Sequence, residues 1–290
     1  MLNARYAVGD VIGRGAFGQV YRCVDVRTGS TLAVKVLQTV RQRETRERTL
    51  RKIHREIDMH RLLSDCPHVA KYVDSFEDAD QAGIAMEYCG GPDLDAYVAH
   101  HGTLSDAQVA GAAAQVLRML RRCHSKGIVF SDVKPANLCV CSPDAPGASD
   151  AGAGAGACAG AASIELKVVD FGCARAERED TDFTGTPAFM SPEALARDFS
   201  YKTDVWSLGV TLYWLYTGEF PCWDTSSLVV SIDYLREAVR ETPVRIDRLS
   251  GMSPEGLDFV MRCLAKKTTH RQSVEEAMAH PFVLQPRRAQ

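Results

Sequence analysis

The sequence lacks the apolar segments that anchor or export proteins. Its longest mostly apolar run, VWSLGVTLYWLY from Val205 to Tyr216, is too short to span a bilayer as a helix and suits a buried helix better. The N-terminal residues, MLNARYAVGD, contain no apolar signal segment. We therefore expect no signal peptide, no transmembrane segment and no membrane partner, and we expect a cytoplasmic or nuclear location.

The sequence also lacks a strong net charge and paired metal-binding cysteines. With 34 Lys and Arg against 37 Asp and Glu, its net charge of -3 gives no reason to expect nucleic acid as a partner. The ten cysteines show no C-x-x-C spacing. A reducing compartment is the simplest interpretation, and a monomer is the default oligomeric state.

What is present is a β-rich first part. Short apolar runs in YAVGDVIG, QVYRCVDV and STLAVKVLQ predict three antiparallel strands, and VAKYVDSF and AGIAMEYC predict two more. Between them, from about Thr39 to Leu63, a helical spacing of Leu50, Ile53 and Ile57 predicts a helix. The Gly-Pro sequence CGGPD then resembles a hinge between two lobes.

The rest of the chain is mainly helical. Apolar residues at helical spacing mark one helix, the run from Val205 to Tyr216 predicts a central one, and Ser253 and Ser273 are expected to cap two later ones. The first helix is marked by Val109, Ala113, Val116, Leu117 and Leu120. The predicted class is α+β, with a small β-rich lobe over residues 1–86, a hinge over 87–91, a helical lobe over 92–283 and a tail over 284–290.

An Ala/Gly-rich tract without periodicity, SPDAPGASDAGAGAGACAGAAS, covers residues 142–163. We predict a flexible insertion. Closing such a loop costs only about 1.5 kcal/mol more than closing a four-residue loop, so strands at LCVC and IELKVVD can form on either side.

A glycine motif, G-x-G-x-x-G, lies at Gly13, Gly15 and Gly18. A dinucleotide-binding motif needs a helix directly after the glycines. Here the strand-like QVYRCVDV follows, which predicts a hairpin whose backbone N–H groups can approach phosphates. A plain glycine-rich turn is the alternative.

Three charged residues stand out for their positions. Lys35 ends a strand-like run that aims it inward, where an ammonium needs a negative partner. Glu56 lies beside Ile53 and Ile57 and could be that partner, or it could be an ordinary surface carboxylate. Asp170 follows an apolar strand in KVVDFG, where a carboxylate could bind Mg²⁺ or simply end the strand.

The stretch FSDVKPAN places Asp132, Lys134 and Asn137 within a few positions. Together with the glycine motif, AVK, D-F-G, S-P-E at Ser191–Glu193 and D-V-W-S-L-G from Asp204, it resembles the eukaryotic protein kinase family of the serine/threonine type. These motifs occur in the family's order over about residues 6–282.

The resemblance implies an enzyme that transfers the γ-phosphate of ATP to Ser or Thr hydroxyls of proteins, with Mg²⁺. It implies that Asp132 receives or orients the substrate proton, that Lys134 steadies the γ-phosphate, and that Lys35, held by Glu56, contacts the α and β phosphates. Asn137 and Asp170 would hold Mg²⁺. The implied ATP-binding set is Ile12, Gly13, Gly15, Gly18, Val20, Ala33, Lys35, Met86, Glu87, Cys89, Asp93 and Cys139.

The resemblance also implies an activation segment. Thr186 resembles the threonine that packs beside the catalytic Asp, Thr181 and Thr184 are candidate phosphorylation sites, and Glu193 is expected to pair with Arg271. Glu193 and Arg271 would form an ion pair with a structural role.

The sequence departs from the family pattern at Phe130 and Ser131, where His-Arg is usual. Ser131 cannot clamp a phosphorylated activation segment, so that contact is absent. The leading prediction is an active kinase that does not depend on an arginine of the catalytic loop. A pseudokinase that binds ATP as a scaffold is the alternative, and a small-molecule kinase is a third.

The string FEDADQAGIAMEYCGGPDLDAYV looks most like the branch of calcium-dependent and calmodulin-dependent kinases. No EF-hand pattern D-x-[DN]-x-[DN]-G is present, however. We expect protein substrates with at most a mild preference for basic residues upstream, because Ala136 stands where basophilic kinases often have Glu.

Overall fold

The computed structural model describes residue 2 and residues 4–15, 18–40, 44–141, 164–177, 183–224 and 231–284. The predictions for Thr181, for the whole tract over 142–163 and for most of the tail lie outside these residues. The described chain forms two compact units. The first unit holds the residues up to Gly91, Cys141 and Lys167–Gly172, and the second holds Pro92–Val140, Ile164–Leu166 and the residues from Cys173 onward.

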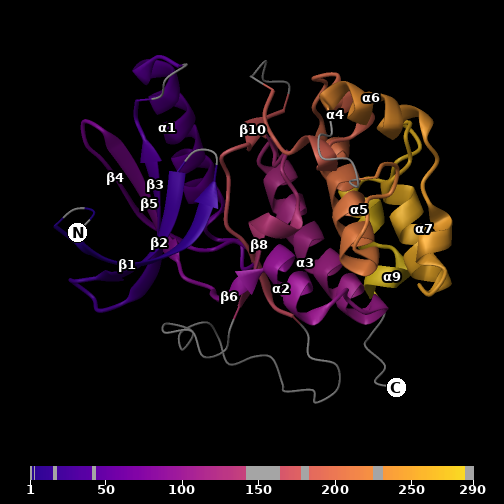
Figure 1. The fold of residues 1–290 in the computed structure, drawn as a ribbon, viewed down its shortest axis with the longest axis horizontal. Helices are drawn as coiled ribbons and strands as arrows, with labels where there is room; N and C mark the ends of the chain where they lie inside the picture. The colour runs from indigo at the N-terminus through magenta and orange to yellow at the C-terminus, as the bar shows by residue number, and fades with distance from the viewer. Residues whose placement is uncertain are drawn as a thin grey trace. The chain divides into compact units, whose positions relative to one another are not determined.

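The first unit is built on an antiparallel sheet of five strands in the order β1-β2-β3-β5-β4 (Figure 1). The strands are β1 (Tyr6–Gly15), β2 (Gly18–Asp25), β3 (Thr31–Gln38), β4 (Tyr72–Glu77) and β5 (Gln81–Glu87). Tyr6, Cys23, Leu32, Val34 and Val36 form an apolar core with Ala85. The five predicted strands are confirmed.

Helix α1 (Arg46–Leu63) belongs to the same unit and buries Ile53, Glu56, Ile57 and His60. It begins later than the predicted start near Thr39. The reason is local, because the Thr45 side chain accepts a hydrogen bond from the N–H of Arg48 and caps the helix there.

The second unit is mainly helical. Its helices are α2 (Leu94–His101), α3 (Asp106–Ser125), α4 (Pro192–Leu195), α5 (Tyr201–Thr217), α6 (Ile232–Glu241), α7 (Pro254–Cys263), α8 (Val274–Met278) and α9 (Pro281–Leu284). Short 3-10 turns occur at η1 (Pro135–Asn137), η3 (Pro187–Phe189) and η4 (Ile246–Leu249). Strands β7 (Ile128–Val129) and β10 (Arg175–Ala176) pair antiparallel. Each of β6 (Gly90–Asp93), β8 (Leu138–Cys141) and β9 (Leu166–Val168) contains a boundary between the units.

Helix α5 is the centre of the second unit, as its apolar sequence predicts. All its residues from Thr203 to Tyr213 are buried, and it contacts α3 and α7. Ser253 caps α7, and Ser273 with Glu276 forms a capping box on α8, which confirms both predicted helix starts. The α+β class, with one β-rich part and one helical part, is therefore confirmed.

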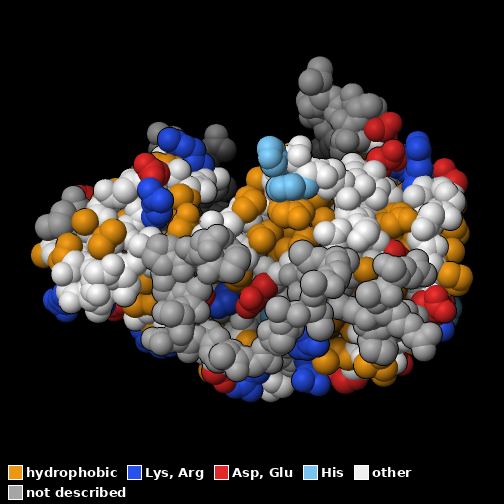
Figure 2. All heavy atoms as spheres, turned by 90° about the horizontal axis from the view of Figure 1, so that it is seen from below, with side chains coloured by type: hydrophobic (Ala, Val, Ile, Leu, Met, Phe, Trp, Pro, Cys, Tyr) orange, Lys and Arg blue, Asp and Glu red, His pale blue; other side chains and the backbone are white. Residues whose placement is uncertain are grey.

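The described surface carries charges of both signs. On the face shown in Figure 2, acidic and basic side chains alternate instead of gathering into one field. Among the described helices, none is long and apolar enough to cross a bilayer.

Candidate active site

A buried lysine and two carboxylates meet in the first unit. The Lys35 Nζ lies 2.6 Å from the Glu56 Oε1 and 2.9 Å from the Asp170 Oδ1. Strand β3 carries the lysine, α1 carries Glu56, and Asp170 follows β9. Lys35 and Glu56 are buried, whereas the Asp170 side chain is 38% exposed. Asp170 is thus the member of this cluster that remains accessible to a ligand.

The cluster keeps Lys35 charged. Burial by itself lowers the pKa of Lys35, but the charges of Glu56 and Asp170 outweigh that effect and raise the pKa above its ordinary value. The N–H of Gly172 donates to the Asp170 Oδ1 at 2.8 Å and fixes the carboxylate further. A Cβ at Gly172 would lie 3.1 Å from that oxygen and 3.2 Å from the Glu56 Oε2, so a side chain here would crowd both carboxylates.

Phe171, between Asp170 and Gly172, stacks on His60 of α1 with ring centroids 4.9 Å apart. The His60 Nε2 donates to the carbonyl of Ala70 at 2.6 Å, and burial lowers the pKa of His60. His60 is therefore a neutral apolar support for the D-F-G segment. No sequence motif predicted a role for His60.

The predicted glycine hairpin is present. Gly15 pairs with Gly18 across β1 and β2, and a strand follows the glycines instead of the helix that a dinucleotide fold requires. A Cβ at Gly18 would lie 1.9 Å from the carbonyl oxygen of Val36, which only glycine permits. In the next strand pair, Val20 lies opposite Lys35.

The other residues of the predicted ATP-binding set fall into both units. Ala33, Met86 and Cys89 of the first unit are buried, and Ile12 is exposed. Glu87 forms an ion pair with Lys167. In the second unit, Cys139 lies on β8 and is partly buried. Asp93 caps α2, because its carboxylate accepts the N–H of Ala96 at 2.8 Å.

Four predicted residues meet in the second unit around the Asp132 carboxylate. Its Oδ2 accepts the side-chain N–H of Asn137 and lies close to the Lys134 Nζ, both at 2.9 Å, and its Oδ1 accepts the backbone N–H of Thr186 at 2.9 Å. The Lys134 Nζ also donates to the Thr186 Oγ1 at 2.6 Å. Asp132 is 8% exposed and is held by donors on both oxygens.

Two hydrogen bonds that its own Nδ2 donates fix the orientation of the Asn137 amide. Its Nδ2 donates to both the backbone carbonyl and the carboxylate of Asp132, so its Oδ1 is the atom suited to a cation. Asp170 offers a carboxylate. Amide and carboxylate oxygens are the donors that Mg²⁺ prefers, so the residue types fit that ion.

Asp204 at the start of α5 holds the backbone at Phe130 and Ser131, directly before Asp132. Its carboxylate accepts the N–H of Phe130 at 2.9 Å and the N–H of Ser131 at 2.7 Å, and the His124 Nε2 lies 2.9 Å from it. Ser131 has a φ of 68°, which is rare for a residue with a side chain. The unusual pair Phe130-Ser131 thus keeps its backbone anchor, a feature that sequence reasoning did not identify.

The remaining predicted residues lie around this loop. Thr184 contacts the side chain of Arg175, and Glu193 forms the expected ion pair with Arg271. Arg271 is fully buried and also lies over the ring of Trp206, with 5.0 Å from its guanidinium carbon to the ring centroid. These contacts belong to the second unit.

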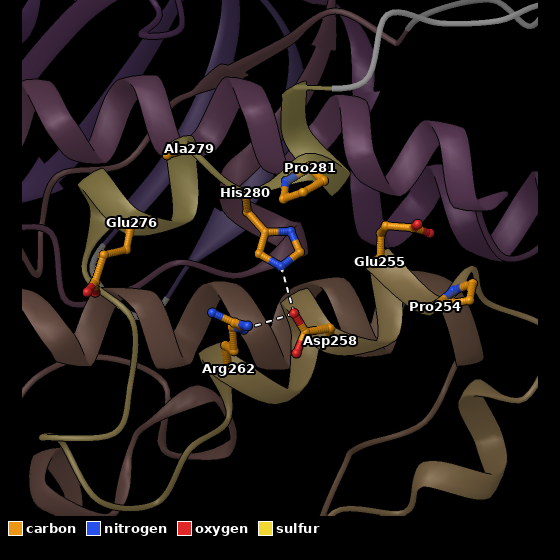
Figure 3. Close-up of a pocket in the computed structure, with 8 residues that line it drawn as sticks. All are labelled: Pro254, Glu255, Asp258, Arg262, Glu276, Ala279, His280 and Pro281. Atoms are coloured by element: carbon orange, nitrogen blue, oxygen red, sulfur yellow. Dashed lines mark hydrogen bonds and ion pairs between the residues drawn. The ribbon is translucent and has the colours of Figure 1, made fainter.

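A separate hollow of about 430 Å³ lies in the second unit, between α7 and the α8–α9 region (Figure 3). Three of the polar side chains in its wall, Asp258, Arg262 and His280, contact one another. Asp258 accepts from His280 and pairs with Arg262, and Glu276 accepts the N–H of Ser273. None of the predicted site residues lines it. This hollow is therefore not part of the candidate active site.

The family model and the curated proteins that match this chain are of the same kind. The family model described as "Protein kinase domain" matches residues 6–283. Similar curated proteins include Calcium-dependent protein kinase 24 of Arabidopsis thaliana, 26% identical over 291 residues that cover 99% of this chain and 46% of that protein. CDPK-related kinase 3 of the same plant is 30% identical over 290 residues, covering 97% and 45%.

A relative from outside the calcium-dependent group also matches. Mitogen-activated protein kinase kinase kinase 3 of Arabidopsis thaliana is 27% identical over 285 residues, covering 97% of this chain and 41% of that protein. The chain spans about half the length of the curated relatives it matches.

Proposed function

Since this chain belongs to the protein kinase family and has its bilobal α+β fold, we propose that it is an active serine/threonine protein kinase that uses Mg²⁺ and ATP. The observation that carries the proposal is the arrangement of Asp132, whose two oxygens are held by Asn137, Lys134 and Thr186. A carboxylate fixed in this way can receive or orient the proton of a substrate hydroxyl without first being reorganised.

The first unit would bind the nucleotide. The glycines of the β1–β2 hairpin let backbone N–H groups approach phosphates, and Lys35, held charged by Glu56, would contact the α and β phosphates. Val20, Ala33 and Cys139 would contact the adenine, and Met86, Glu87 and Cys89 would bind ATP at and next to the hinge. We propose ATP binding for the whole predicted set on this basis, including Ile12, Glu87 and Asp93.

Mg²⁺ would be held by the Asp170 carboxylate and the Asn137 amide oxygen. When bound, the ion neutralises charge that develops on the phosphates during transfer. Lys134, 2.9 Å from the Asp132 Oδ2, would steady the transferred phosphoryl group, and Thr186 contacts both residues through its N–H and its hydroxyl. These are positioning and electrostatic roles, which carry most of the catalysis in phosphoryl transfer.

The departure at Phe130 and Ser131 does not remove a ligand or a reacting group. The pair keeps its backbone hydrogen bonds to Asp204, and Phe130 is buried. We therefore propose catalysis in preference to a purely scaffolding role.

The substrates we propose are proteins with Ser or Thr acceptors, in the cytoplasm or nucleus, with a monomeric kinase as the default. The lobes at 1–86 and 92–283, the hinge at 87–91 and the tail at 284–290 are part of the same proposal. The calcium in the names of several relatives is not carried over, because no EF-hand pattern occurs in these 290 residues.

Transfer of the ATP γ-phosphate to a mixed Ser/Thr peptide library tests the proposal. We expect transfer by the wild-type protein and by Asp247→Asn, an exposed control in η4, and a fall of at least about 100-fold for Asp132→Asn. Asp132→Asn should still bind Mg²⁺ and ATP, as measured by a thermal shift. Binding by the wild type without any transfer would support the scaffold instead.

A further inference from the structure

Lys167 is a mostly buried cation of the first unit. It lies on β9, three residues before Asp170, and its side chain is 13% exposed. Its Nζ forms an ion pair with the Glu87 Oε1 at the end of β5. An ammonium shielded from water to this degree is costly unless a carboxylate compensates its charge. The pair with Glu87 supplies that compensation.

The contact keeps Lys167 charged. Burial by itself lowers the pKa of Lys167, but the hydrogen bond and the charge of Glu87 outweigh burial and raise the pKa above its ordinary value. Lys167 is therefore an ammonium at neutral pH.

Both oxygens of the Glu87 carboxylate contact groups of the protein. Its Oε1 accepts from the Lys167 Nζ, and its Oε2 accepts the backbone N–H of Lys71 at 3.1 Å. The carboxylate is thus held by two neighbouring segments of the first unit. We therefore expect Glu87 to reach ATP through its backbone.

Strand β9 and the end of β5 are joined twice. Val168 of β9 makes two backbone hydrogen bonds of 2.9 Å to residues 68–70, and the N–H of Glu87 donates to the carbonyl of Lys71 at 2.9 Å. This first connection uses backbone groups. The second is the ion pair between Lys167 and Glu87. Removing Lys167 would leave the backbone connection in place and release the side chain of Glu87.

The two ends of this connection carry different parts of the predicted nucleotide site. Glu87 belongs to the predicted ATP-binding set at the hinge, and β9 leads to Asp170, the candidate Mg²⁺ ligand. Asp170 also has its own contact with Lys35, 2.9 Å between Oδ1 and Nζ, and Lys35 is held by Glu56. The phosphate-binding residues are therefore supported without Lys167, whereas the Glu87 side chain is not.

We propose that Lys167 is a positioning residue for the adenine end of ATP, which acts by holding Glu87 at the hinge through their ion pair. The proposal rests on the proposed kinase function and deepens it, because it assigns nucleotide recognition to a residue outside the predicted ATP-binding set. It implies that the loss of Lys167 weakens contacts to the adenosine part of ATP and spares contacts to the phosphates.

The test compares Lys167→Met, which removes the charge at similar length, with Lys167→Arg, which keeps it. Lys52→Met is the matched control, because Lys52 forms an ion pair of 2.5 Å with Glu44 in the same unit, outside the predicted nucleotide site. Isothermal titration calorimetry measures the binding of three probes to each protein. The probes are ATP with Mg²⁺, adenosine alone, and inorganic tripolyphosphate with Mg²⁺.

We expect the dissociation constants of Lys167→Met for ATP and for adenosine to rise about 10-fold. Its dissociation constant for tripolyphosphate should stay within about twofold of the wild-type value, because Lys35 and Asp170 keep their contacts. Lys167→Arg and Lys52→Met should bind all three probes like the wild type. A role in stability alone would not separate adenosine from tripolyphosphate.

If Lys167→Met does not fold, Lys167→Gln gives the same comparison, since it lacks the charge but can still donate to Glu87. Two results would overturn the inference. One is adenosine binding by the Lys167 variant that matches Lys52→Met, and the other is an equal loss of affinity for adenosine and tripolyphosphate. A wild type that binds ATP but transfers no phosphate would contradict the proposed function, and the binding comparison would still decide the role of Lys167.

Discussion

At the scale of single residues, His60 packs against the D-F-G segment. Its ring supports Phe171, and its Nε2 proton is used by the carbonyl of Ala70. Because the pKa of His60 is lowered by burial, the folded protein resists a proton that the unfolded chain accepts at about pH 6.5. In the folded protein, the His60 ring that stacks on Phe171 is therefore neutral.

We predict that the free energy of unfolding falls as the pH drops below about 6.5, because the unfolded state then binds one more proton than the folded state. Below that pH, His60 alone changes the free energy of unfolding by at most about 1.4 kcal/mol per pH unit. Well above pH 6.5 it has no effect, because the ring is neutral in both states. His60→Gln can still donate to Ala70 but does not titrate in this range. Urea unfolding between pH 5.5 and 7.5 should show a smaller slope for it than for the wild type.

His100→Gln is the control, because His100 is an exposed histidine on α2. It should leave the slope close to that of the wild type. Equal slopes for the wild type and His60→Gln would contradict the prediction.

At the scale of elements, a buried ion pair joins α1 to the sheet of the first unit. Lys35 of β3 and Glu56 of α1 are both less than 10% exposed in their side chains. Removing one partner of such a pair leaves an uncompensated buried charge, whereas replacing both with apolar side chains of similar size does not. The pair thus links the position of α1 to the charge state of Lys35.

We predict that Lys35→Met lowers the free energy of unfolding by about 3–5 kcal/mol, because the buried Glu56 carboxylate loses the positive charge of Lys35. The double variant Lys35→Met with Glu56→Met should recover most of that loss, while phosphate transfer stays absent in both. Urea unfolding of the wild type, the single variant and the double variant gives the three values. If the double variant is no more stable than Lys35→Met, the loss of stability does not come from the Glu56 charge.

At the scale of the whole molecule, the Ala/Gly-rich tract over 142–163 joins two strands, β8 and β9, across a long stretch of sequence. Loop closure depends only on the logarithm of length, so an insertion of this size is compatible with the fold. The residues of the candidate active site are all outside the tract.

We predict that replacing residues 142–163 with a four-residue turn raises the free energy of unfolding by about 1.5 kcal/mol, the loop-closure difference. Phosphate transfer should be unchanged within about twofold, because no catalytic residue is removed. Denaturant unfolding and peptide assays on the shortened chain test both statements. A loss of stability or of activity would mean that the tract makes contacts that the fold or the reaction needs.

Much of the fold could be predicted from local patterns. Short apolar runs predicted β1 to β5, helical spacing predicted α3, and a continuous apolar run predicted α5. Ser253 and Ser273 predicted the starts of α7 and α8. These features depend on neighbours within a few positions, so the sequence displays them directly. The start of α1 was placed too early, because the charged residues before it continue a helical pattern that the Thr45 cap interrupts.

The amino-acid sequence by itself determined the family, the α+β class and the identity of the candidate residues from Ile12 to Thr186. Only the tertiary structure decided which of them touch and what supports them. Asp204 accepts from Phe130 and Ser131, more than seventy residues away, and His60 stacks on Phe171. Such partners are brought together by packing between distant elements, and no local spacing encodes packing at that distance.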